Sequence, residues 1–471
     1  MSPFKRFSLF LLPSVFQGTI SLLILPITTH ILGPKDYGVF ALVISFTSFG
    51  TMIATFGSGY LLSMHYPLAD EHGKRQLIST FIVSGIVVSV LFSFLFLTGW
   101  FIAAKTSKNL FSIPYSGIVL ALATMVLSVP WSIASDVIIL EGKAKFYAVL
   151  TIAQSAVSAL AVTAGLYIFK LELLSLFFAG TMGAIVAFAG AVVTLRQHLR
   201  LVVSGKWLKE MLKLGAISGF GSIMENIQLI SERYLLSVYS GLSQLGIYSH
   251  SQQYRSLVSM PVKAVANAMW PITLSEAHED KRLFLRTAKG WNIVYIGITV
   301  AGLFFALLGK DIIDLLTNNK FGEAYAYATL WMLFILVQNI GKTQTGILFA
   351  GGHGALYGKI TAVSFSMGTG FIVIFVPFVG ATGALLALIA SQIILRLLIQ
   401  IYSNRLHKTI FLDLWVLIGS AFILLALGVS IFFHLPMLQR MLVFIFLVGS
   451  LTYLARNILA VFLLEGFMDA K

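Results

Sequence analysis

The sequence predicts an all-α polytopic membrane protein with about 14 transmembrane helices, arranged as two pseudo-symmetric six-helix bundles and a C-terminal helix pair. The first observation is composition. The chain of 471 residues is 58% hydrophobic and 11% charged, whereas soluble domains are about 45 to 50% apolar and about 25% charged. The second is that apolar residues fall in runs of about 20 or more, enough to cross the roughly 30 Å hydrocarbon layer. The third is a pair of internal sequence repeats, which divides these apolar runs into two halves with similar sequences.

The apolar runs define the expected spans in chain order. Lys5 and Arg6 precede the first run, as in a signal peptide, but no small-x-small cleavage site follows it. The run is therefore expected to be a transmembrane helix. The expected spans are Ser8 to Ile31, Tyr37 to Met64, Leu77 to Ala104, Ser116 to Leu140, Phe146 to Phe169, Leu173 to Leu195, Leu214 to Tyr239, Leu245 to Ile272, Trp291 to Leu316, Tyr325 to Ala350, Gly354 to Phe378, Gly380 to Ile401, Phe411 to Phe433 and Leu438 to Leu464.

These spans group into four predicted parts. Residues 1–195 form an N-terminal six-helix lobe, 196–213 a basic cytoplasmic connector, 214–401 a C-terminal six-helix lobe and 402–471 the terminal helix pair. Basic residues favour one side of the membrane by roughly 17 to 7, and the positive-inside rule therefore places both termini in the cytoplasm.

The two lobes carry similar sequences at corresponding places. Leu32–Phe40 resembles Ser240–Tyr248, and Gly142–Tyr147 resembles Gly352–Tyr357 at nearly the same offset. Because each repeat holds an even number of spans, the lobes should be related by an axis along the membrane normal and enclose a central cleft. The alternative is that glycine-aromatic turns recur by chance.

Several classes of function are disfavoured. The chain has no cysteine, which excludes disulfides, thiolate metal sites, iron–sulfur clusters and a cysteine nucleophile. The net charge of +14 lies in short loops rather than in a long basic stripe, so no nucleic acid is expected as a partner. The histidines lack metal-ligand spacing, no P-loop follows a strand and no Gly-x-Ser-x-Gly elbow occurs, so no metal, no cofactor and no catalytic residue is expected.

Charged residues inside the spans are the candidate functional groups. Each costs at least about 2.5 to 3.5 kcal/mol at the bilayer centre unless it reaches the interface. Four lie near cytoplasmic helix ends, where they can snorkel: Asp136, Lys359, Arg396 and Arg456. Six lie deeper or about two turns from an outer end: Glu225, Glu232, Arg233, Arg255, Lys263 and Lys342.

The deeper residues lie on polar helical faces. Span eight carries one such stripe, Gln252, Arg255, Ser259, Lys263 and Asn267; span ten carries Gln338, Lys342 and Thr345. This spacing predicts a wet central cavity with an excess of positive charge, which attracts an anionic head group such as a pyrophosphate. The alternative is structural ion pairing of Glu225 with Arg233 or Arg255. Pro261 and Pro271 are expected to kink or end the helix of span eight.

Nearly the whole chain resembles the Wzx-type O-antigen and polysaccharide flippases of the MOP exporter superfamily, which have a MATE-like fold. The resemblance rests on the first apolar helix, the turn Leu32–Gly38, and the segments Glu232–Leu236 and Leu245–Tyr248. It implies a flippase that moves an undecaprenyl-diphosphate-linked oligosaccharide across the bacterial cytoplasmic membrane by alternating access. Arg233 matches a basic residue that similar flippases place after an acidic residue in span seven.

The resemblance and the charge pattern together give the expected site. The substrate-binding candidates are Arg233, Arg255, Lys263, Lys342, Gln252 and Gln338, and the proton-coupling candidates are Glu225, Glu232 and Asp136. The implied partners are the lipid-linked oligosaccharide, membrane lipids, and a polysaccharide polymerase and chain-length regulator of the O-antigen and lipopolysaccharide type.

Three other functions stay open. A MATE-like cation-coupled drug antiporter needs buried carboxylates, but span one has none and the deep charges are mostly basic. A lipid II flippase usually carries arginine in span one, which is absent here. A membrane-bound glycosyl-transferring enzyme stands third, because the outer loops are too short for a catalytic domain.

Overall fold

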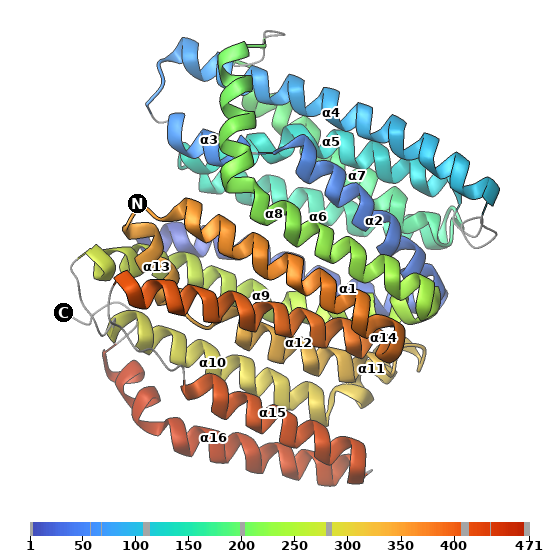
Figure 1. The fold of residues 1–471 in the computed structure, drawn as a ribbon. Helices are drawn as coiled ribbons and strands as arrows, with labels where there is room; N and C mark the ends of the chain where they lie inside the picture. The colour runs from blue at the N-terminus through green and yellow to red at the C-terminus, as the bar shows by residue number, and fades with distance from the viewer. Residues whose placement is uncertain are drawn as a thin grey trace. The chain divides into compact units, whose positions relative to one another are not determined.

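The computed structural model describes residues 3–56, 58–66, 68–106, 114–197, 203–278, 285–406, 414–433 and 435–465. Within these ranges the chain forms 16 α-helices (Figure 1), of which nine are long and apolar enough to cross a membrane. The predicted all-α polytopic fold is confirmed. The helices are α1 (Pro3–Ile31), α2 (Pro34–Ala54), α3 (Ser58–His65), α4 (Glu71–Thr106), α5 (Tyr115–Leu140), α6 (Ala144–Tyr167), α7 (Leu174–Leu195), α8 (Gly205–Tyr239), α9 (Gly241–His278), α10 (Leu285–Leu307), α11 (Gly309–Thr317), α12 (Ala324–Asn339), α13 (Lys342–Ala350), α14 (Gly354–Leu406), α15 (Leu414–Phe433) and α16 (Met437–Glu465).

Some expected spans are interrupted in the structure. The second is divided into α2 and α3, the ninth into α10 and α11, and the tenth into α12 and α13. Pro261 and Pro271 do not end α9, which continues to His278. Residues 198–202 of the expected connector, Phe411–Asp413 of the thirteenth span and the side chain of Asn267 lie outside the described residues.

The long helix α14 contains two expected spans joined by a tight reversal. Gly380 has φ of 60° and ψ of −134°, a conformation that favours glycine. The two arms run antiparallel, since the Ser391 hydroxyl donates to the Ser364 carbonyl at 3.1 Å. A Cβ on Gly383 would lie 2.6 Å from the Phe375 carbonyl oxygen, so the backbones nearly touch.

The chain separates into two compact units, unit 1 (Met1–Ser237) and unit 2 (Val238–Lys471). In unit 1, α5, α6 and α7 pack together, α2 and α4 lie against α5, and α1 lies against α6. Its apolar core includes Leu61, Ile78, Val129, Ile133 and Leu195, all at most 1% exposed. The division expected at residues 196–213 stays a prediction.

Unit 2 is built around α10. Helices α9, α12, α15 and α16 all pack on it, and Figure 1 shows the terminal pair α15 and α16 lying alongside it. The terminal pair therefore shares the core of unit 2, through Leu303, Leu307, Ala426 and Leu447.

One of the two pairs of similar sequence segments also shares its backbone geometry. Gly142 and Gly352 have φ of 70° and 74°. In the first turn Lys143 N–H donates to the Ile138 carbonyl at 3.0 Å, and in the second His353 N–H donates to the Leu348 carbonyl at 2.8 Å. The same helix-ending turn thus leads into α6 and into α14.

Candidate functional site

Arg255 lies against an aromatic face of α12. Its guanidinium carbon is 4.3 Å from the centroid of the Trp331 ring and 4.6 Å from that of Phe334. Both rings are buried, at 0% and 4% exposure. A guanidinium at this distance is attracted to the ring faces, more strongly where water is excluded. Residues of α12 thus hold the charge of Arg255 at a fixed place in unit 2.

The break between α12 and α13 gathers polar groups in unit 2. Gly341 has φ of 67° and separates the two helices. A guanidinium N–H of Arg396, from α14, donates to the Gln338 carbonyl, and the Tyr295 hydroxyl donates to the Asn339 carbonyl at 2.9 Å. These donors satisfy carbonyls at the end of α12, which water cannot reach in an apolar layer.

Arg396 lies in a different environment from the one that the sequence predicted. It was expected to snorkel to the cytoplasmic interface, but it is 8% exposed and bonds to the interrupted helix. Lys342 is the first residue of α13, on the other side of the same break. Gln338, Lys342 and the hydrogen bond from Arg396 are therefore all located at the break between α12 and α13. The half-buried Gln252 and the exposed Lys263 lie on α9.

Arg233 belongs to a different group of contacts. It lies in unit 1, on α8, and its Nη1 donates to the Ser45 hydroxyl at 2.8 Å and to the Ala41 carbonyl at 3.3 Å, both on α2. The neighbouring Glu232 is 0% exposed, whereas Glu225 is exposed.

Asp136, the remaining coupling candidate, lies on α5 and is half-buried. Its carboxylate abuts the start of α3, because a Cβ on Gly59 would lie 3.1 Å from its Oδ2. Within the described ranges, His, Asp and Glu side chains form no cluster of three that suits a metal ion.

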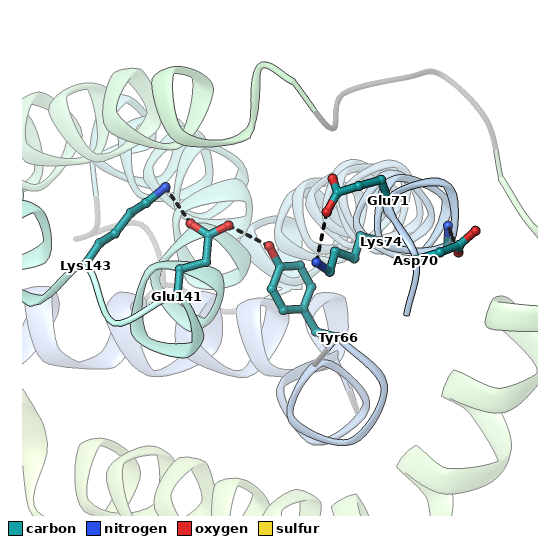
Figure 2. A network of polar contacts seen from close by, with 7 residues as sticks. Tyr66, Asp70, Glu71, Lys74, Glu141 and Lys143 are labelled. Atoms are coloured by element: carbon teal, nitrogen blue, oxygen red, sulfur yellow. Dashed lines mark hydrogen bonds and ion pairs between the residues drawn. The ribbon is translucent and has the colours of Figure 1, made fainter. Parts of the chain in front are cut away.

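A polar network in unit 1 was not predicted from the sequence (Figure 2). The Tyr66 hydroxyl donates to Glu141 Oε1 at 2.7 Å, and Lys143 Nζ pairs with Glu141 Oε2 at 2.7 Å. Lys74 pairs with Glu71 at 2.9 Å and lies 5.3 Å from the centroid of the Tyr66 ring. The network joins the segment between α3 and the first turn of α4 to the turn between α5 and α6.

The same network affects ionisation of Tyr66. Burial raises the pKa of the Tyr66 phenol above its usual value, and the hydrogen bond to Glu141 and the charges of Glu141 and Glu71 raise it further. Tyr66 therefore stays a neutral hydrogen-bond donor at physiological pH. Tyr66 and Glu141 are 75 residues apart, and no local sequence pattern links them.

Solved structures of transporters share the fold of this chain. An inward-facing multidrug resistance MATE family transporter of the MOP superfamily aligns with a TM-score of 0.62 at 16% identity, over 87% of this chain and 96% of that one. The mutant VcmN MATE transporter of Vibrio cholerae gives 0.58 at 12% identity, over 86% and 96%. The chain thus has the fold of these transporters, and the candidate membrane spans among its described residues support a multi-pass membrane protein.

The family follows from the sequence comparison. Residues 5–278 match the family described as polysaccharide biosynthesis protein, and the chain belongs to that family. No curated protein sequence matches it. A further solved structure, a MOP superfamily transporter from Pyrococcus furiosus, aligns with a TM-score of 0.56 at 14% identity, over 87% of this chain and 98% of that one. Its binding pocket is described as having reversed polarity that suggests a different function.

Proposed function

We propose that this protein is a flippase that moves a lipid-linked oligosaccharide, carried on undecaprenyl diphosphate, across the bacterial cytoplasmic membrane by alternating access. Basic side chains bind the anionic diphosphate in a water-filled cavity, while the lipid tail stays in the bilayer. Both chain termini face the cytoplasm. A polysaccharide polymerase and a chain-length regulator are the protein partners.

The observation that carries this proposal is the sign of the charge on the helices of unit 2. Arg255, Lys342 and Arg396 come from α9, α13 and α14, and two of them are held by aromatic faces or by a helix end. Basic groups at bilayer depth are costly unless they have partners or a function. They favour an anionic cargo over the cations that a drug antiporter exports. Membership of a polysaccharide biosynthesis family supports a sugar-bearing cargo.

The test uses cells in which the gene is deleted and surface polysaccharide is measured. Lys342→Gln and Arg255→Gln should each lower export, because losing one bond to a charged group, about 1.5 to 3 kcal/mol, corresponds to roughly tenfold or more in affinity. Lys342→Arg should keep most activity. Lys310→Gln, an exposed change on α11, is the matched control.

Full export by a variant that lacks the charges of Arg255, Lys263 and Lys342 would contradict the proposal, provided that the variant reaches the membrane folded. The second candidate is a cation-coupled drug antiporter, which the names of the aligned MATE transporters favour. In that case deletion leaves surface polysaccharide unchanged and expression raises resistance to cationic dyes. A lipid II flippase would instead show a defect in cell-wall precursors.

A further inference from the structure

Trp331 of α12 is held in place by residues of α9. Its indole N–H donates to the Ser251 hydroxyl at 3.1 Å, and that hydroxyl donates to the Tyr248 carbonyl at 2.6 Å. The Tyr248 ring also lies against the indole, with centroids 5.8 Å apart. Trp331 and Ser251 are both 0% exposed. Because a buried indole that turns loses its hydrogen bond to Ser251, the ring of Trp331 has a fixed orientation in the core of unit 2.

Phe334 adds a second ring to this surface. It lies three residues after Trp331, and residues at this spacing share one face of a helix. The two rings meet edge-on, with centroids 5.2 Å apart and planes at 82°. The guanidinium carbon of Arg255 lies over both, at 4.3 Å and 4.6 Å from the centroids. We call Trp331 and Phe334 the aromatic pair. A guanidinium in contact with two nearly perpendicular rings is restricted in both position and direction.

The helix that fixes the aromatic pair also carries the arginine. Ser251 and Arg255 are four residues apart on α9 and therefore share a face, and α9 packs on α12. Arg255 is half-buried, whereas the rings of the aromatic pair are buried, at 0% and 4% exposure. A solute that reaches this group therefore meets the side chain of Arg255 and not the rings.

A guanidinium that is already in position is a better ligand than a mobile one. A long side chain loses conformational freedom when it binds, and avoiding this loss is worth about two- to tenfold in affinity for each side chain. A ring face attracts a cation without contributing a negative charge, so the aromatic pair itself does not neutralise the arginine. The planar fork of a guanidinium also binds two oxygens of a phosphate group only in a restricted set of directions.

We propose that Trp331 and Phe334 are positioning residues, which hold the guanidinium of Arg255 in the orientation that binds two oxygens of the cargo's diphosphate. The inference rests on the proposed function, because it takes Arg255 as a ligand of the anionic head group. It deepens that function by assigning the residues that make this position require a guanidinium. The aromatic pair does not itself touch the cargo.

The first experiment measures binding of an undecaprenyl-diphosphate-linked oligosaccharide to the full-length protein in lipid nanodiscs. Trp331→Leu and Phe334→Leu should each raise Kd by about three- to tenfold, because the arginine then has to be ordered on binding. Trp331→Phe keeps a ring face and should stay within about twofold of wild type. Trp291→Leu is the matched control, since it removes a buried indole that meets Tyr295. It should leave Kd unchanged.

A double-mutant cycle separates positioning from a general effect on the fold. In the Arg255→Gln background, Phe334→Leu should change Kd no further, because the ring acts only through the arginine. An equal loss of affinity with and without Arg255 would overturn the positioning role. Arg255→Lys keeps the charge but loses the planar fork, and it should bind about as weakly as Arg255→Gln. Binding by Arg255→Lys as tight as that of wild type would also overturn the proposal.

Fluorine NMR tests the contact without any cargo. The chain has seven tryptophans, and with 5-fluorotryptophan the resonance of Trp331 is assigned by its loss in Trp331→Phe. Arg255→Gln should shift this resonance and Trp291→Leu should not; an unshifted resonance in Arg255→Gln would overturn the proposal. Wild-type protein that fails to bind the lipid-linked oligosaccharide would overturn the proposed function and with it the ligand role of Arg255. Binding of equal affinity in wild type and in both leucine variants of the aromatic pair would overturn the positioning role alone.

Discussion

At the scale of single residues, the arginines of this chain are held by quite different partners. Arg255 stacks on aromatic rings, Arg396 bonds to the end of a broken helix, and Arg440 joins a carbonyl and a carboxylate. The guanidinium suits all three because it is planar, always charged and rich in donors. Each arrangement stabilises positive charge inside an apolar fold without requiring a fully buried acid.

Arg440 is predicted to fasten the terminal helix pair. It donates to Asp311 Oδ1 at 2.9 Å and to the Leu307 carbonyl at 3.2 Å, and its side chain is 14% exposed. Arg440→Gln should lower the free energy of unfolding by about 1 to 2 kcal/mol, since the Asp311 carboxylate loses its partner. Thermal unfolding in detergent measures this. Arg456→Gln, an exposed change on the same helix, should have almost no effect. Equal losses in both variants would contradict this role.

The partners of the charged residues could not be predicted from the sequence. Position within an apolar run predicts only depth in the membrane, and for Lys342 and Arg255 this depth stays a prediction. Partners depend on packing between distant helices: Arg396 lies 58 residues from Gln338, and Arg440 lies 129 from Asp311. For Arg396, position near a span end favoured snorkelling, but the open end of α12 offered a carbonyl acceptor.

At the scale of elements, apolar runs predicted length well and continuity poorly. The breaks before α3, α11 and α13 fall inside runs that were each expected to form a single span. An apolar run of sequence indicates how favourable the transfer of its side chains from water into lipid is. A break in a helix depends instead on neighbouring residues that form hydrogen bonds with the backbone groups freed at the break. At the end of α12, Tyr295 and Arg396 donate hydrogen bonds to these backbone carbonyls. The reversal at Gly380 agrees with the two expected spans Gly354 to Phe378 and Gly380 to Ile401.

Small residues set the spacing of helices in unit 1. A Cβ on Gly85 of α4 would lie 2.7 Å from Val129 Cγ1 and 3.0 Å from the Ala54 carbonyl oxygen, whereas Gly99 of the same helix has nothing within 4 Å. Gly85→Ala should therefore cost about 1 to 3 kcal/mol through overpacking. Gly99→Ala should gain about 0.5 to 1 kcal/mol from helix propensity. Thermal unfolding of the two variants tests the pair, and the same sign for both would show that the close approach does not matter.

At the scale of the whole molecule, the fold class was the most predictable property. Composition and span length indicate a membrane protein. The repeated sequence segments at Gly142 and Gly352 indicate two related halves, and in the structure both segments form the same type of turn. Residues 205–213 look like a basic linker in the sequence, but Trp207 and Met211 of this stretch belong to the apolar core of unit 1. A charge count does not detect two apolar side chains on an otherwise basic stretch.

The cargo is the property on which the account depends most, and one reconstitution tests it. Purified protein in liposomes should move an undecaprenyl-diphosphate-linked oligosaccharide between leaflets, and Lys342→Gln should slow this by roughly tenfold. Repeating the assay with and without a proton gradient shows whether Glu225, Glu232 or Asp136 couples protons to transport. Liposomes that extrude a cationic dye, with the lipid-linked sugar left in its original leaflet, would contradict the account.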